Sequence, residues 1–163
     1  MSKTKCENRP LLFIAGLIME AILAFLLTSC SSSGPIYVSL YGNEKMNVEN
    51  EKTNESHAVL VCLYMLRSET NFMRVPLETF WQEGEKAFAS DLVGIREEKI
   101  LIPNDTQWVP LHLTKEVNFI GAAADFRRPD KKGWRLVYSL ADKKPKEIWL
   151  TVGKDKIEIE RIK

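Results

Sequence analysis

The chain has 163 residues, and its 23 basic and 22 acidic residues leave a formal net charge of +1. This near-neutral balance gives no support for nucleic acid as a partner, because nucleic-acid binding depends on basic residues that neutralise phosphates. The 134 residues from position 30 onward fit one domain, which is large enough to bury a core without metals or disulfides.

The N-terminal segment has the layout of a secretory signal. Basic residues precede an apolar run from Leu11 to Leu27, and small residues then lead to Cys30. This order predicts a signal peptide over residues 1–29. The closing residues Leu27-Thr28-Ser29-Cys30 resemble a bacterial lipobox, in which the cysteine is acylated and becomes the first mature residue. Ser31 after the cysteine resembles the outer-membrane sorting pattern of enteric lipoproteins.

Two alternatives compete with the lipoprotein signal. An uncleaved transmembrane anchor would be short, at about 17 residues, and would place Glu20 in its centre, where an acid is costly. A buried core helix is the other alternative. The polar residues 30–35, which begin at the cysteine and read as a flexible tether, favour the lipoprotein signal.

Most of the remaining chain predicts β-strands, because β-branched and aromatic residues recur with apolar residues at alternate positions. In the run 57–67 both alternating faces are apolar, which is typical of a strand buried on both sides. Pro110 places its strand at an edge or bulge, and Gly121 to Ala124 leave room for a neighbouring layer. The other expected strands are 36–41, 98–103, 108–113, 117–127, 134–140, 148–152 and 157–159.

One region predicts short helices, at about residues 76–92. Pro76 suits a first helical turn and Gly84 interrupts the pattern. Its aromatic residues are expected to dock on a sheet, and these are Phe80, Trp81 and Phe88. The sequence therefore predicts an all-β domain over residues 36–163, a two-sheet β-sandwich with a short helical insertion.

The stretch from Asn43 to Ser56 is polar and has no period, which predicts a loop. Met46 and Val48 are its apolar members. Fourteen residues is long for a connection between strands, and long loops in compact domains are often functional or disordered.

The residues offer no catalytic or metal-binding set. Cys62 lies within an apolar strand, and the histidines His57 and His112 lie on other segments. A buried cysteine without electropositive neighbours is an inert small hydrophobe. The basic turn at residues 126–133 suits a solvated turn better than a phosphate or lipid-headgroup contact. We expect no enzyme activity, no metal, no cofactor and no small-molecule substrate.

Read in order, these segments resemble one family, the outer-membrane lipoprotein of the type VI secretion system known as TssJ. The resemblance rests on an ordered set of motifs together with the lipobox. A departure from the family pattern is Cys62, where an arginine is usual. The motifs are MNV (residues 46–48), VCLYML (61–66), FASDL (88–92), IP (102–103), IGAAADFR (120–127) and GWR (133–135).

The resemblance implies a transthyretin-like sandwich with a structural role. Such a lipoprotein holds the periplasmic part of a large inner-membrane protein (TssM) against the outer membrane. The loop after the first strand contacts the partner in that family. Carried over to this sequence, the contact residues are Met46, Asn47, Val48, Glu49 and Asn50.

Two other functions stay open from the sequence. A lipoprotein that binds a small ligand or cell-wall sugar would need aromatics and polar groups that line a cleft, whereas the aromatics here fall at core-like positions. An envelope hydrolase would need a nucleophile and a base in contact.

Overall fold

The computed structural model describes residues 34–49, 52, 54–141 and 144–163. The expected signal peptide, Cys30 and Asn50 lie outside the described residues. Within them, no helix is both long and apolar enough to cross a membrane.

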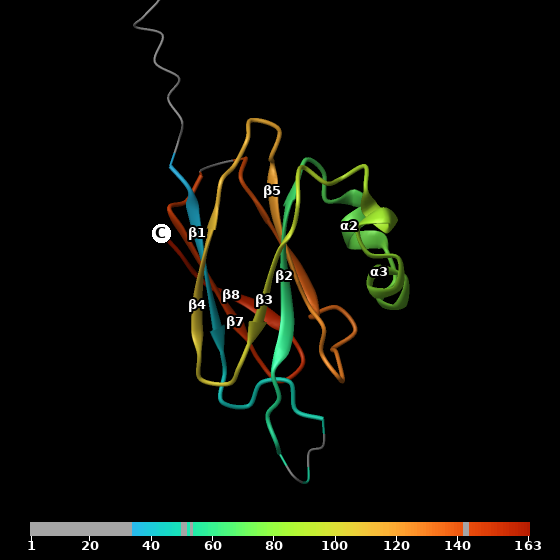
Figure 1. Cartoon of the computed structure of the whole chain (residues 1–163), viewed down its shortest axis with the longest axis vertical. Helices are drawn as coiled ribbons and strands as arrows, with labels where there is room; N and C mark the ends of the chain where they lie inside the picture. The colour runs from blue at the N-terminus through green and yellow to red at the C-terminus, as the bar shows by residue number, and fades with distance from the viewer. Residues whose placement is uncertain (1–33, 50–51, 53, 142–143) are drawn as a thin grey trace, which may run out of the picture. The chain divides into compact units, whose positions relative to one another are not determined.

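Eight strands form two packed sheets, as the sequence pattern predicts (Figure 1). The first sheet has the order β4-β1-β7-β8 and the second β3-β2-β5-β6. All pairs are antiparallel except β1 with β7, which run parallel. The strands are β1 (Ile36–Gly42), β2 (Val59–Leu66), β3 (Glu97–Leu101), β4 (Thr106–Leu111), β5 (Phe119–Ala124), β6 (Arg135–Ser139), β7 (Glu147–Val152) and β8 (Ile157–Ile162).

The core between the sheets comes from alternate positions on the inner strands. Val38 and Leu40 of β1 are fully buried, as is Val61 of β2. Pro110 lies on β4, an edge strand of the first sheet, where a missing N–H is tolerated.

The other face of β2 lies under the helical insertion, which explains why both faces of this strand are apolar. The insertion comprises α2 (Thr70–Arg74), α3 (Leu77–Glu83) and the 3₁₀ helix η1 (Gly84–Phe88). Tyr64 of β2 meets Phe72, Phe80 and Phe88 with ring centroids 5.3–5.8 Å apart. We call this outer surface of the second sheet the covered face.

The small residues of β5 allow the insertion to approach closely. A Cβ atom on Gly121 would lie 3.0 Å from both Leu66 Cδ1 and Phe72 Cζ. The space expected at Gly121 to Ala124 is therefore filled by an aromatic ring of the insertion.

The sequence placed the start of the insertion too late, because α2 begins at Thr70 rather than near Pro76. A five-residue helix is too short to show a period. The carboxylate of Asp91 stabilises it by accepting hydrogen bonds from the backbone N–H groups of Asn71 (2.6 Å) and Phe72 (2.9 Å). The β5 strand is also shorter than predicted, since the chain leaves the sheet after Ala124.

Candidate protein-binding site

Three loops gather at the end of the sandwich opposite the start of β1 (Figure 1). They are the β1–β2 loop (residues 43–58), the β5–β6 loop (125–134) and the β7–β8 loop (153–156). We call this surface the loop end. The predicted loop from Asn43 to Ser56 forms most of it, and its described residues contain no helix or strand.

Asn47 ties these loops together. Its side-chain Nδ2 donates to the carbonyl oxygen of Ala58 at 2.8 Å, and its Oδ1 accepts from the backbone N–H of Arg127 at 2.8 Å. Its own backbone N–H donates to Gly153 at 3.1 Å. The side chain is buried and φ is +50°, a conformation that asparagine tolerates better than most residues. One residue therefore fixes the relative positions of all three loops.

The apolar residues of the β1–β2 loop face inward. Met46 and Val48 are buried, and the backbone N–H of His57 donates to the carbonyl of Met46 at 3.2 Å. Burial of these two side chains stabilises the base of the loop. Such anchoring explains why a polar loop has a defined conformation in this part.

Among the described contact residues that the family resemblance implies, Glu49 is exposed. Its carboxylate accepts a hydrogen bond from Arg127 Nη1 at 2.5 Å, and its carbonyl accepts one from Arg128 Nη1 at 3.2 Å. Because both partners of the ion pair are about half exposed, it contributes little to stability, about 1 kcal/mol or less. These charges are available to a partner.

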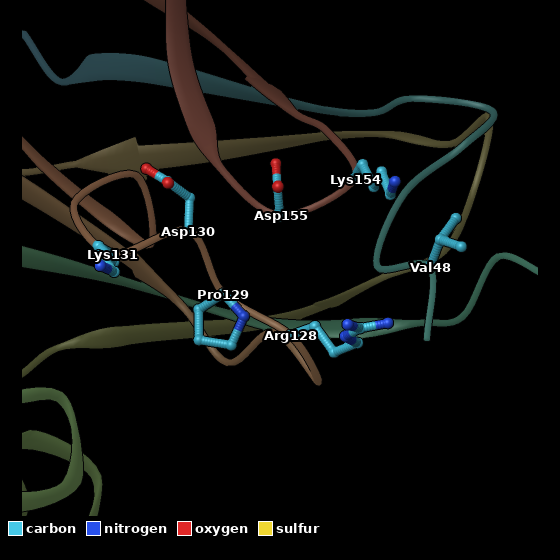
Figure 2. A pocket seen from close by; sticks show the side chains of 7 residues that line it. All are labelled: Val48, Arg128, Pro129, Asp130, Lys131, Lys154 and Asp155. Atoms are coloured by element: carbon cyan, nitrogen blue, oxygen red, sulfur yellow. The ribbon is translucent and has the colours of Figure 1, made fainter. Parts of the chain in front are cut away.

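A pocket of about 300 Å³ lies beside Val48, between the β5–β6 and β7–β8 loops (Figure 2). Apart from Val48 and Pro129, charged side chains line it: Arg128, Asp130, Lys131, Lys154 and Asp155. The basic turn of the sequence thus lies next to the β1–β2 loop. Small-ligand pockets are mostly apolar, so this lining better suits the polar surface of a protein.

Asp130 has a local structural role in the turn. The backbone N–H of Lys132 holds the pKa of this carboxyl below its usual range, helped by the N–H of Gly133. The Gly133 N–H donates to Asp130 Oδ2 at 3.0 Å. The β5–β6 loop is therefore held by the Asp130 carboxylate within the loop as well as by the hydrogen bond to Asn47.

The candidate nucleophile and bases do not form a catalytic arrangement among the described residues. Cys62 is buried in the middle of β2, and burial raises the pKa of its thiol to about 11. His57 precedes β2, while His112 is exposed after β4. Over the ranges that the structure describes, no group of three or more His, Cys, Asp or Glu side chains is placed to hold a metal ion.

A family model of type VI secretion lipoproteins (T6SS-SciN), which names VasD, EvfM and TssJ, matches residues 35–160. No curated protein sequence matches the chain.

Solved structures share this fold. A type VI membrane complex chain has a TM-score of 0.70 and 19% identity, covering 78% of this chain and 98% of its own. The T6SS lipoprotein TssJ1 from Pseudomonas aeruginosa has a TM-score of 0.69 and 20% identity, covering 80% and 96%. A structure of the T6SS protein TssM C-terminal domain from EAEC has a TM-score of 0.66 and 19% identity, and the match covers 79% of this chain and 99% of that chain.

Proposed function

Because the chain belongs to the family of type VI secretion lipoproteins that includes TssJ, we propose that it tethers the periplasmic domain of TssM to the outer membrane. In this proposal residues 1–29 are removed, Cys30 carries the acyl chains, residues 30–35 are the tether and residues 36–163 are the sandwich. The protein has a structural role and catalyses no reaction.

The observation that carries the proposal is the position of the loop end. β1 begins at Ile36, next to the tether, and ends at Gly42, directly before the partner loop. Seven extended residues separate these points by roughly 20 Å. A strand paired on both sides therefore lies between the anchor and the proposed TssM contact.

A defined loop base also supports the proposal. Preorganised contact residues lose less conformational freedom on binding. Asn47 and the buried Met46 and Val48 supply this order, while Glu49, Asn54 and Glu55 are exposed. We assign the TssM contact to the segment 49–56, in which Glu49, Asn54 and Glu55 are exposed, and not to the buried side chains of Met46 and Val48.

Replacing residues 49–56 by a short glycine-serine linker tests the contact. Co-purification with TssM should be lost, while the melting temperature should change little because Met46, Asn47 and Val48 remain. The matched control replaces residues 113–116, a loop at the opposite end of the sandwich, and should retain TssM. Retained binding in the 49–56 variant would contradict the assignment.

Palmitate labelling of the wild-type protein and of Cys30→Ala tests the anchor separately. We expect label in the wild type alone, and recovery of the wild type with outer membranes. Label on the Cys30→Ala protein would show that the acylated residue is another one.

A further inference from the structure

The outer surface of the first sheet, which we call the open face, exposes large aromatic side chains. Trp108 of β4 is 48% exposed and Tyr37 of β1 is 44% exposed. Trp149 of β7 is half-buried, and its ring meets that of Trp108 edge-on with centroids 5.0 Å apart. Ser39 is paired in register with both tryptophans, and its small side chain lets the two rings meet.

Basic groups lie beside the Trp149 ring of this aromatic cluster. The guanidinium of Arg161 lies 4.3 Å from the centroid of the Trp149 ring, and Lys163 Nζ lies 5.6 Å from it. Lys146 is exposed, and its backbone is hydrogen-bonded to both Tyr37 and Lys163. The open face thus has its basic side chains at the end where β1 begins.

The acid at this end is already engaged. Glu147 accepts a hydrogen bond from Trp149 Nε1 at 3.2 Å and forms an ion pair with Lys163 at 3.4 Å. These two contacts hold the pKa of the Glu147 carboxyl below its usual range, and the hydrogen bond from Trp149 has the larger effect. Glu147 therefore orients Trp149, while the exposed Lys146 and the exposed guanidinium of Arg161, which lies over the Trp149 ring, can contact an anionic partner.

Within the residues that the structure describes, no helix or loop covers the open face, whereas α2, α3 and η1 lie over the other sheet (Figure 1). Contiguous exposed aromatic surface of this kind marks an interaction site. Tryptophan and tyrosine beside lysine and arginine are the side chains that gather at membrane–water interfaces.

The length of the tether decides between possible occupants. Tyr37 is seven residues after Cys30, so an acylated Cys30 keeps it within roughly 25 Å of the bilayer. The sheets of a sandwich pack only about 10 Å apart. The membrane surface is therefore always within reach of the open face, at the high effective concentration that a short linker provides.

We propose that the open face binds the surface of a phospholipid bilayer, an inference that rests on the proposed anchoring function. Tyr37, Trp108 and Trp149 lie at headgroup level, and Arg161 and Lys146 contact lipid phosphates. Acyl chains alone leave a domain free to rotate about its tether. This second contact fixes one orientation and so presents the loop end to TssM in one direction.

The test uses residues 34–163, which form one of the two contact units of the chain and contain the buried core found among the described residues; circular dichroism first verifies that this domain is folded. Gly34 has no atom within 4 Å of its Cβ position, so Gly34→Cys provides a thiol for coupling to a maleimide lipid, while Cys62 is buried. The vesicles contain phosphatidylcholine and phosphatidylglycerol, with or without brominated acyl chains. Bromine quenches the tryptophan fluorescence only where a ring reaches the lipid.

We expect clear quenching of the wild-type domain. Tyr37→Glu combined with Lys146→Glu keeps all four tryptophans and should reduce quenching about five-fold, since each basic residue at an anionic surface contributes about one kcal/mol. The double variant Lys144→Glu with Lys146→Glu leaves the side chains on the strands unchanged and should also reduce the quenching. The matched control, Ile95→Glu with Lys86→Glu, changes exposed residues beside the other sheet and should quench like the wild type.

Absence of quenching in the wild-type domain would overturn the proposal. An equal loss of quenching in the test variants and in the control variant would also overturn it. A domain that dimerises through Trp108, or binds TssM through it, would assign the face to a protein and overturn the membrane assignment. Because the maleimide lipid replaces Cys30, this result is independent of palmitate labelling, which tests the anchor itself.

Discussion

The two outer faces of the sandwich carry similar aromatic side chains but differ in what lies over them. On the covered face, Tyr64 is enclosed by the phenylalanines of the insertion. On the open face, Trp108 and Trp149 form an equally close edge-on pair, and Trp108 is half exposed. Aromatic rings on alternate strand positions thus stabilise the fold where another layer covers them, and supply a binding surface where none does.

The largest expected effect of a substitution is on the covered face. Phe80 stacks on Phe88 at 5.0 Å and meets Trp134 edge-on at 4.9 Å. Phe80→Ala should lower the free energy of unfolding by about 3–5 kcal/mol, because it removes a fully buried ring and leaves a cavity. Denaturant titration measures this, and Phe80→Leu should cost less. A loss under about 1 kcal/mol would show that the insertion contributes little to stability.

Asp91 gives the next largest effect, because it connects the two ends of the insertion. Its buried carboxylate accepts hydrogen bonds from the backbone N–H groups of Asn71 and Phe72. Asp91→Ala leaves these groups unpaired and should cost about 1.5–3 kcal/mol in the free energy of unfolding. Hydrogen exchange should show faster exchange of the α2 amides. The control Gln82→Ala, at an exposed position of α3, should leave their exchange unchanged.

Gly121→Ala tests the close approach of the insertion to β5. The added Cβ would contact Leu66 and Phe72 at 3.0 Å, and such overpacking costs about 1–3 kcal/mol. Thermal unfolding should show a lower melting temperature. Gly153→Ala is the control, since its nearest atom, the Lys156 carbonyl oxygen, would lie 3.6 Å away. Equal stability of Gly121→Ala and wild type would mean that the insertion can shift outward.

The smallest stability effect should come from the open face. Trp108→Ser removes a half-exposed ring and its contact with Trp149, which is worth about 1 kcal/mol. Thermal unfolding should therefore change little, while bilayer contact weakens. If Trp108→Ser destabilised the domain as much as Phe80→Ala, the open face would be part of the structural core and the comparison would fail.

Strand alternation was enough to predict several features. Residues 57–67 are apolar on both faces, and β2 indeed lies between the first sheet and the insertion. Pro110 is on an edge strand, and the small residues of β5 do make room for a neighbouring layer. Each of these follows from local chemistry: side-chain size, a missing N–H, or the two-residue period of a strand.

Contacts distant in sequence were not predictable in the same way. The short helix α2 depends on Asp91, which follows its first residues by about twenty positions. The resemblance predicts Asn47 as a contact residue, and the structure adds that its bonds to Ala58 and Arg127 support the loop end. No periodic pattern encodes a side chain that bridges loops 80 residues apart.

Residue order alone predicts the class of the fold, the side chains that share each strand face, the polar loop and the lipobox-like motif at Cys30. The parallel pairing of β1 with β7, the burial of Met46 and Val48 and the covering of one aromatic face depend on tertiary contacts. Alternation shows which side chains share a face, but packing between distant segments decides what lies against it.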